Sequence, residues 1–184
     1  AQGTTVDEIR DKYNSLQEAE ALMMEQANEA WKTAGMSAND YMDTATSMAA
    51  SLVNSLGGDT VEAARLTDVA IQAMSDNANT FGTDIEAIKN AYSGFAKQNY
   101  TMLDNLKLGY GGTKTEMERL IADANEYAST IGEASDMSID SYADIVRAIE
   151  LIQEKQQIAG TTAREAMTTI EGSANATKAA WENV

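Results

Sequence analysis

The residues of this chain whose types and spacing could support chemistry begin with the glycine-rich segment Gly109–Thr115. Its glycines and its lysine resemble those of a phosphate-binding loop, but Leu108 stands where the first glycine of that motif belongs. Thr113 separates Gly112 from Lys114, and no strand pattern precedes the segment. We therefore interpret it as a joint between two helices, with Thr113 capping the second helix.

A second segment, Asp76–Gly82, has the start of a calcium-binding loop. The third and fifth positions of that loop would be Ala78 and Thr80, and the twelfth would be Ala87 in place of the usual Glu. This set of oxygen ligands is inadequate. The segment is better explained as a helix end that leads into a cap at Thr83.

Neighbouring carboxylates could in principle act as general acid and base, as in Glu116 with Glu118 or Asp7 with Glu8. These residues fall in the first turns of predicted helices, where the helix dipole already favours acidic side chains. Cysteine and histidine are both absent, which removes thiolate nucleophiles, disulfides, ordinary zinc sites and the usual proton shuttle. We assign no catalytic, cofactor-binding or metal-binding residue and expect no enzyme.

Composition narrows the class of protein further. The 184 residues suit one domain or two small ones, with 29 acidic residues against 13 basic ones and a net charge of −16. Tight nucleic-acid binding is disfavoured because it needs basic side chains to neutralise phosphates. No run of about 18 apolar residues predicts a membrane span. The start at Ala1, without Met or a signal-peptide pattern, suggests a piece of a longer protein.

Helix signals divide the chain. Proline is absent, and no sustained alternation predicts a strand. Capping residues followed three positions later by an acid mark six helix starts, and the five that follow an earlier predicted helix come shortly after a glycine. These are Thr5 with Glu8, Ser37 with Asp40, Asp59 with Glu62, Thr83 with Glu86, Thr113 with Glu116 and Thr162 with Glu165.

The sequence thus predicts an all-α fold, a bundle or array of about seven amphipathic helices joined by short glycine-containing turns. The expected helices cover residues 5–34, 38–56, 59–80, 83–98, 113–131, 138–158 and 162–182, with a short turn near 101–107.

The first predicted helix is long and has the apolar spacing of a coiled coil. Its stripe is interrupted only by Glu20 and comprises Val6, Ile9, Tyr13, Leu16, Met23, Ala27, Ala30 and Ala34. We expect two units, a long N-terminal helix over residues 1–34 that could form a coiled coil and a compact helical domain over 35–184.

Aromatic residues mark the least regular part of the chain. Trp31, Trp181, Phe81 and Phe95 could anchor a partner, although helical spacing places such residues more often in the core. A cluster between two predicted helices is our candidate for a packed hinge or a partner contact. It comprises Phe95, Tyr100, Leu103, Leu106, Leu108 and Tyr110, followed by Gly111 and Gly112.

The run Tyr92–Leu120 also carries a resemblance to a known family. Its central words, FAKQNYTMLDNLKLGYGGTKTEMERL, resemble a block of phage tail tape-measure proteins, the phage-related minor tail protein family. Further similar segments extend the resemblance from about Trp31 to the C-terminus. They are Ala34–Met42, Leu56–Asp59, Met74–Asn79 and Ala179–Asn183.

The resemblance implies a structural virion protein that lies in the lumen of a phage tail, helps to set tail length during assembly and leaves ahead of the DNA. It also implies synthesis in the cytoplasm of a bacterial host. The implied partners are the tail-tube protein, tail assembly chaperones and distal tail or baseplate proteins, with copies associating through helices.

Three other interpretations stay open from the sequence. The chain could be a helical adaptor or coiled-coil interaction protein with no phage role, a signalling rod, or a hydrolase. A rod would need uninterrupted heptads, which Gly57 and Gly58 break. A single helix of the whole chain would reach only about 276 Å, so this segment could hardly be an entire length ruler.

Overall fold

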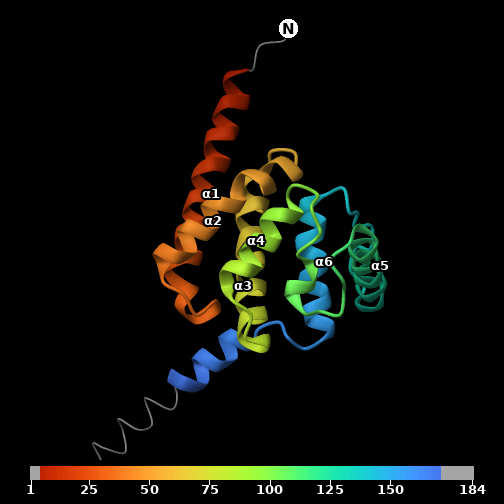
Figure 1. Ribbon diagram of the computed structural model, residues 1–184. Helices are drawn as coiled ribbons and strands as arrows, with labels where there is room; N and C mark the ends of the chain where they lie inside the picture. Colours follow the sequence, from red (N-terminus) through yellow and green to blue (C-terminus); the bar gives the residue numbers. More distant parts are fainter. Residues whose placement is uncertain (1–4, 171–184) are drawn as a thin grey trace, which may run out of the picture.

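The computed structural model describes residues 5–170, and this part of the chain is helical, without a strand (Figure 1). The expectation of an all-α fold is confirmed. The helices are α1 (Val6–Thr33), α2 (Ala38–Ser55), α3 (Thr60–Phe81), α4 (Ile85–Phe95), α5 (Lys114–Ile131) and α6 (Tyr142–Lys155), with a short 3₁₀ turn η1 (Leu103–Leu106). Residues 161–170 are helical as well. None of these helices is both long and apolar enough to cross a membrane.

Four of the predicted helix starts are confirmed as N-caps. The side-chain oxygens of Thr5, Ser37, Asp59 and Thr113 each accept a hydrogen bond from the backbone N–H three residues later, at 3.0–3.2 Å. Each bond satisfies an amide that has no partner within its own helix.

Three predicted starts are wrong. Asp84, and not Thr83, caps α4, and its carboxylate accepts from two backbone N–H groups at 2.9 and 3.2 Å. Helix α6 begins after its cap at Ser141 and not at residue 138. The last helix begins at residue 161, so Thr162 lies inside it. The predicted end of that helix, and Trp181, lie outside the described residues.

The cap of the last helix comes from a distant part of the chain. Asp76, on α3, is 3% exposed, and its carboxylate accepts from the backbone N–H groups of Gly160 at 2.6 Å and Thr162 at 2.8 Å. The segment that resembled a calcium loop therefore supplies a helix cap that fixes the chain after α6 onto α3.

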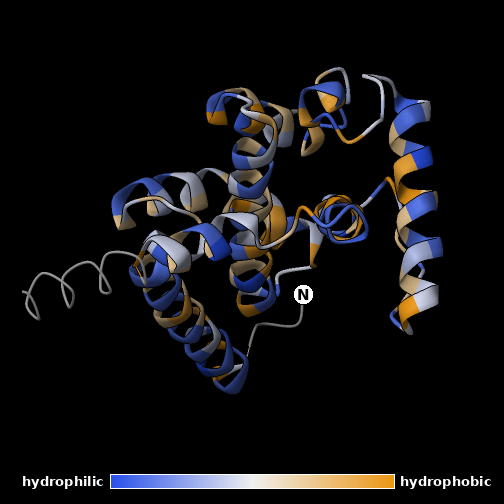
Figure 2. Cartoon of the chain, turned by 90° about the horizontal axis from the view of Figure 1, so that it is seen from below, coloured by the Kyte–Doolittle hydropathy of each residue, from blue (hydrophilic) through white to orange (hydrophobic). Residues whose placement is uncertain are grey.

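Helix α3 is the central element. It contacts α1, α2, α4 and α6, while α5 packs on α6 at the outer side (Figure 1). Each helix carries apolar and polar bands, as its stripe predicts (Figure 2). The main core draws buried residues from α2 to α6 and includes large side chains such as Leu66, Phe95, Leu120 and Ile149.

Helix α1 differs between its two halves. In the second half, Ala27 and Ala30 are buried against Tyr41 and Ile71, in a small cluster separate from the main core. The first half rises clear of the other helices (Figure 1). Among residues 5–170, the predicted stripe therefore packs against other helices over only part of its length.

Candidate functional site

The segment predicted as a hinge or partner contact connects α4 to α5. We call residues 95–113 the α4–α5 joint. Its first turn is tight, because the N–H groups of Gln98 and Asn99 bond back to the carbonyls of Phe95 and Gly94 at 3.0 and 2.9 Å. Gln98 takes the left-handed conformation there, with φ 58°. The chain then passes through η1 before it reaches the cap at Thr113.

The apolar side chains of the joint lie in the core. Leu103 and Leu106 are 0% exposed, Phe95 is 1% exposed, and Tyr100 and Tyr110 are 6% and 8% exposed. A partner cannot reach side chains buried this completely while the fold is intact. The sequence predicted that these residues form either a packed hinge or a partner contact. Their burial favours the packed hinge.

Aromatic rings connect the joint to α4. The Phe95 ring lies between Tyr92 and Tyr100, with ring centroids 5.7 and 6.4 Å away. Such pairs add roughly 0.5–1.5 kcal/mol beyond the area they bury. The Tyr100 hydroxyl donates to the carbonyl of Ile139 at 3.4 Å, which connects the joint to the segment before α6.

Amide side chains from two helices hold the backbone of the joint. Asn77 Nδ2, on α3, donates to the carbonyl of Leu106 at 2.6 Å. Gln156 Nε2, just after α6, donates to the carbonyl of Leu108 at 3.0 Å. Irregular backbone near a core needs such partners because its polar groups have no helical ladder to join. The joint is therefore fixed from both neighbouring elements.

The end of the joint holds a charged cluster. Arg119 Nη2 donates to Glu116 Oε2 at 2.6 Å and to the carbonyl of Gly109 at 2.8 Å, and its guanidinium lies 4.3 Å from the centre of the Tyr110 ring. Glu116 Oε2 also accepts from the N–H of Gly111 at 3.0 Å. The hydrogen bonds from Arg119 and Gly111 lower the pKa of Glu116 to about 2. Burial, with a hydrogen bond to Asp123, raises the pKa of Tyr110.

Gly112 marks the closest approach of backbones in the joint. A Cβ atom added there would meet the backbone carbonyl of Thr101, well inside any real contact. At Gly111 the nearest atom to an added Cβ is Glu116 Cγ, at 3.5 Å, which is an ordinary contact. The sequence Gly111-Gly112 thus contains one glycine that the packing requires and one that it does not.

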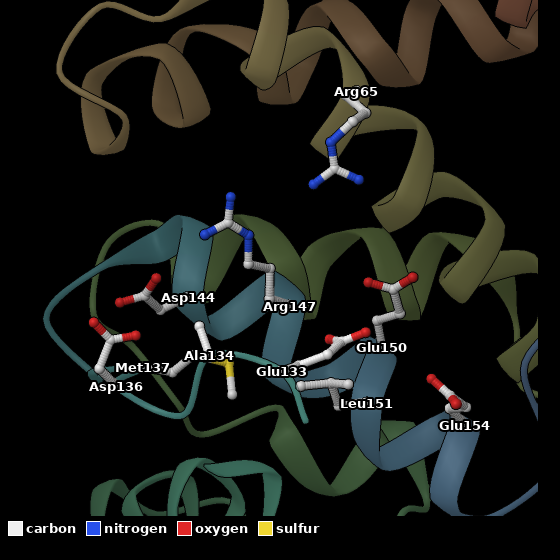
Figure 3. A pocket seen from close by; sticks show the side chains of 10 residues that line it. All are labelled: Arg65, Glu133, Ala134, Asp136, Met137, Asp144, Arg147, Glu150, Leu151 and Glu154. Atoms are coloured by element: carbon white, nitrogen blue, oxygen red, sulfur yellow. The ribbon is translucent and has the colours of Figure 1, made fainter. Parts of the chain in front are cut away.

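A polar pocket of about 400 Å³ lies between α3, α6 and the segment that precedes α6 (Figure 3). Arg65 from α3 and Arg147 from α6 point into the gap between the helices. Both donate to Glu62, at 2.8 and 2.5 Å. Hydrogen bonds from Arg65, which has the larger effect, and from Arg147 lower the pKa of Glu62 to about 2.

Some of the acidic side chains of this pocket accept hydrogen bonds from neighbouring parts of the chain. Asp144 accepts from the N–H of Ser138 at 3.1 Å, and Glu154 accepts from the Tyr127 hydroxyl at the same distance. Burial raises the pKa of Glu150. Within residues 5–170, no group of three or more acidic side chains is placed to hold a metal ion. The contacts present give the pocket a structural task, the pairing of α3 with α6.

Two other features of the site escaped the sequence patterns. The caps by Asp76 and the carbonyl contact by Asn77 depend on residues far apart along the chain, which no local spacing reveals. Ser141 with Asp144 does follow the same capping spacing as the other helix starts, and that signal could have placed α6 correctly. Trp31, a possible anchor, is 50% exposed at the end of α1.

Comparisons with known proteins give no relative: no protein-family model, no curated protein and no solved structure matches this chain.

Proposed function

We propose that this chain is a segment of a phage tail tape-measure protein, a structural component that helps to set tail length during assembly and is released during genome ejection. The observation that carries the proposal is the word order of Tyr92–Leu120, which resembles that family. On this proposal the protein is made in the bacterial host cytoplasm and ends in the tail lumen, and it is not an enzyme.

The contacts of the described residues suit a structural task. The segment that carries the resemblance contains the α4–α5 joint, whose backbone carbonyls accept hydrogen bonds from the side chains of Asn77 and Gln156. The ionised side chains of the pocket beside α6 pair two helices. The proposed partners are the tail-tube protein, assembly chaperones and distal tail or baseplate proteins, and copies would associate through helices.

A compact bundle and an elongated ruler make different demands on the chain. An extended form in a tail would require the helices to leave their core or to assemble with other segments. The small cluster of Ala27, Ala30, Tyr41 and Ile71 would separate at lower cost than the main core, because α1 contributes only the small side chains of Ala27 and Ala30 to it, and these bury little apolar area. We propose that any extension begins between α1 and the other helices.

The test is an in-frame deletion of residues 5–170 from the parent gene, followed by electron microscopy of the virions. Shortened tails are the expected result, and tails of unchanged length would contradict a ruler role for this segment. Gly112→Ala and Gly111→Ala form a matched pair of point variants. Only the first should lower the yield of assembled tails, because only the first disturbs the packed joint.

A second candidate function is a helical interaction module with no phage role. The first half of α1 favours it, because Val6, Ile9 and Tyr13 are exposed apolar residues on one stripe. The genes that neighbour the parent gene discriminate between the two candidates. Adjacent tail-tube and distal-tail genes support the phage proposal, and a neighbourhood without them supports the interaction module.

A further inference from the structure

The first half of α1 presents an apolar stripe with no partner among residues 5–170. We call Val6, Ile9, Tyr13 and Leu16 the α1 seam; their side chains are 80%, 57%, 59% and 49% exposed. The spacing of the four residues, in steps of three and four, is that of one side of a coiled coil. The seam lies on the part of α1 that projects from the bundle (Figure 1).

An apolar groove continues the α1 seam at its base. The groove has a volume of about 310 Å³ and is lined from three helices, by Leu16 and Met23 of α1, Met42 and Val53 of α2, and Ala63 of α3. Leu16 and Met23 are themselves stripe positions, so the seam and the groove form one surface. A projecting helix with one apolar stripe and an apolar groove thus occur side by side on the same molecule.

We propose that this surface binds a second copy of the chain, with the two α1 helices antiparallel about a two-fold axis. A two-fold contact needs a surface that complements itself. The α1 seam beside the groove meets that condition, because the seam of each copy can lie over the groove of the other. The axis passes between Tyr13 and Leu16, so Tyr13 of each copy faces Leu16 of the other. Val6 then lies opposite Met23, over the groove of the second copy.

The length of the contact favours the antiparallel arrangement. The exposed α1 seam covers less than two heptads, whereas a coiled coil that stands alone needs roughly three or more. In the antiparallel register the paired stretch runs from Val6 to Met23, and the walls of the groove in α2 and α3 add contacts beyond the helix pair. A parallel pair would leave both grooves open.

The charges beside the seam favour the same register. Glu20 is an exposed stripe position, and a parallel pair in register would place the two Glu20 carboxylates against each other. In the antiparallel register Glu20 faces Ile9 of the second copy and lies beside its Arg10. Arg10 then faces Gln17, and Lys12 faces Ala19, so no like charges meet.

This inference depends on the geometry of α1 and not on the proposed phage function, so either can fail alone. Sedimentation equilibrium of the 184-residue chain should give a monomer–dimer equilibrium with Kd in the micromolar range, about 1–100 µM. Leu16→Glu should raise that Kd at least about 30-fold, because it places a charge at the centre of the contact. A chain that stays monomeric to about 1 mM would overturn the proposal.

The matched control is Asn14→Glu, which adds the same charge to an exposed position outside the stripe. It should leave the Kd within about threefold of the parent value. Both variants should keep the helical circular dichroism of the parent chain, since neither position is buried. Equal weakening by the two variants would show that overall charge, and not the α1 seam, controls association.

The orientation is tested with spin labels on single cysteines, because the chain has none of its own. Asp7 and Asn28 each lie one residue after a stripe residue, Val6 and Ala27. The variants Asp7→Cys and Asn28→Cys therefore place the labels at equivalent heptad positions. With a rise of 1.5 Å per residue, the antiparallel dimer separates the backbone positions along the axis by about 22 Å at 7 and about 40 Å at 28. Similar short distances at both positions would show a parallel pair and overturn the proposed arrangement.

Discussion

The α1 seam and the α4–α5 joint are both rich in apolar residues, but the fold treats them in opposite ways. The seam is regular in sequence and exposed in structure, with Ile9 and Tyr13 more than half exposed. The joint is irregular in sequence and nearly closed to solvent, with Leu103 and Leu106 fully buried. A regular stripe therefore identifies a face that needs a partner, but it does not tell which molecule supplies the partner.

The sharpest test of this difference removes one large side chain from each region. Phe95→Ala should lower the free energy of unfolding by about 3–5 kcal/mol, because it opens a cavity among Tyr92, Tyr100 and the core. Ile9→Ala should change it by less than about 0.5 kcal/mol when the chain is dilute, since the side chain is already exposed. Urea unfolding monitored by circular dichroism measures the free energy of unfolding of both variants. Equal losses of stability would show that the α1 seam and the α4–α5 joint do not differ in packing.

A second prediction concerns the two adjacent glycines of the joint. Gly112→Ala should destabilise the chain by about 3 kcal/mol, because the new Cβ meets the rigid backbone of Thr101. Gly111→Ala is the control and should cost less than about 1 kcal/mol, since its contact is ordinary. Thermal unfolding midpoints compare the pair. If both variants unfold at the parent temperature, the joint is loose and its description as packed is wrong.

The smallest expected effect is a pH dependence at the end of the joint. The pKa of Glu116 is lowered to about 2 in the fold, so its ion pair stabilises the native state above the ordinary carboxyl pKa and is lost as pH falls toward 2. Glu116→Gln should therefore unfold at a slightly lower temperature than the parent at pH 7, and the difference should shrink as the solution is acidified.

The control for this titration is Glu118→Gln, two residues further along α5. Glu118 lies 3.8 Å from Lys114, and both side chains are largely exposed. Such a surface pair contributes little, so the variant should follow the parent chain closely over the same pH range. If the unfolding temperature of Glu116→Gln also equals that of the parent chain at pH 7, the ion pair does not stabilise the joint.

Local chemistry predicted most of the helices. The caps at Thr5, Ser37, Asp59 and Thr113 depend on residues three positions away, so the sequence displays them directly. The cap by Asp76 joins residues 84 positions apart and depends on how α3 lies against the chain after α6. The same reason explains why the sequence could not decide whether Phe95 and Tyr100 face a partner or the core.

The measurement that tests the central contrast most directly is hydrogen exchange of the native chain at two protein concentrations. At high dilution the amides of residues 9–16 should exchange quickly, while joint amides such as that of the fully buried Leu103, which bonds to the carbonyl of Tyr100, should exchange slowly. At high concentration the residues of the α1 seam should become protected and the joint should not change. Fast exchange throughout the joint, or a seam that is equally protected at both concentrations, would contradict the account.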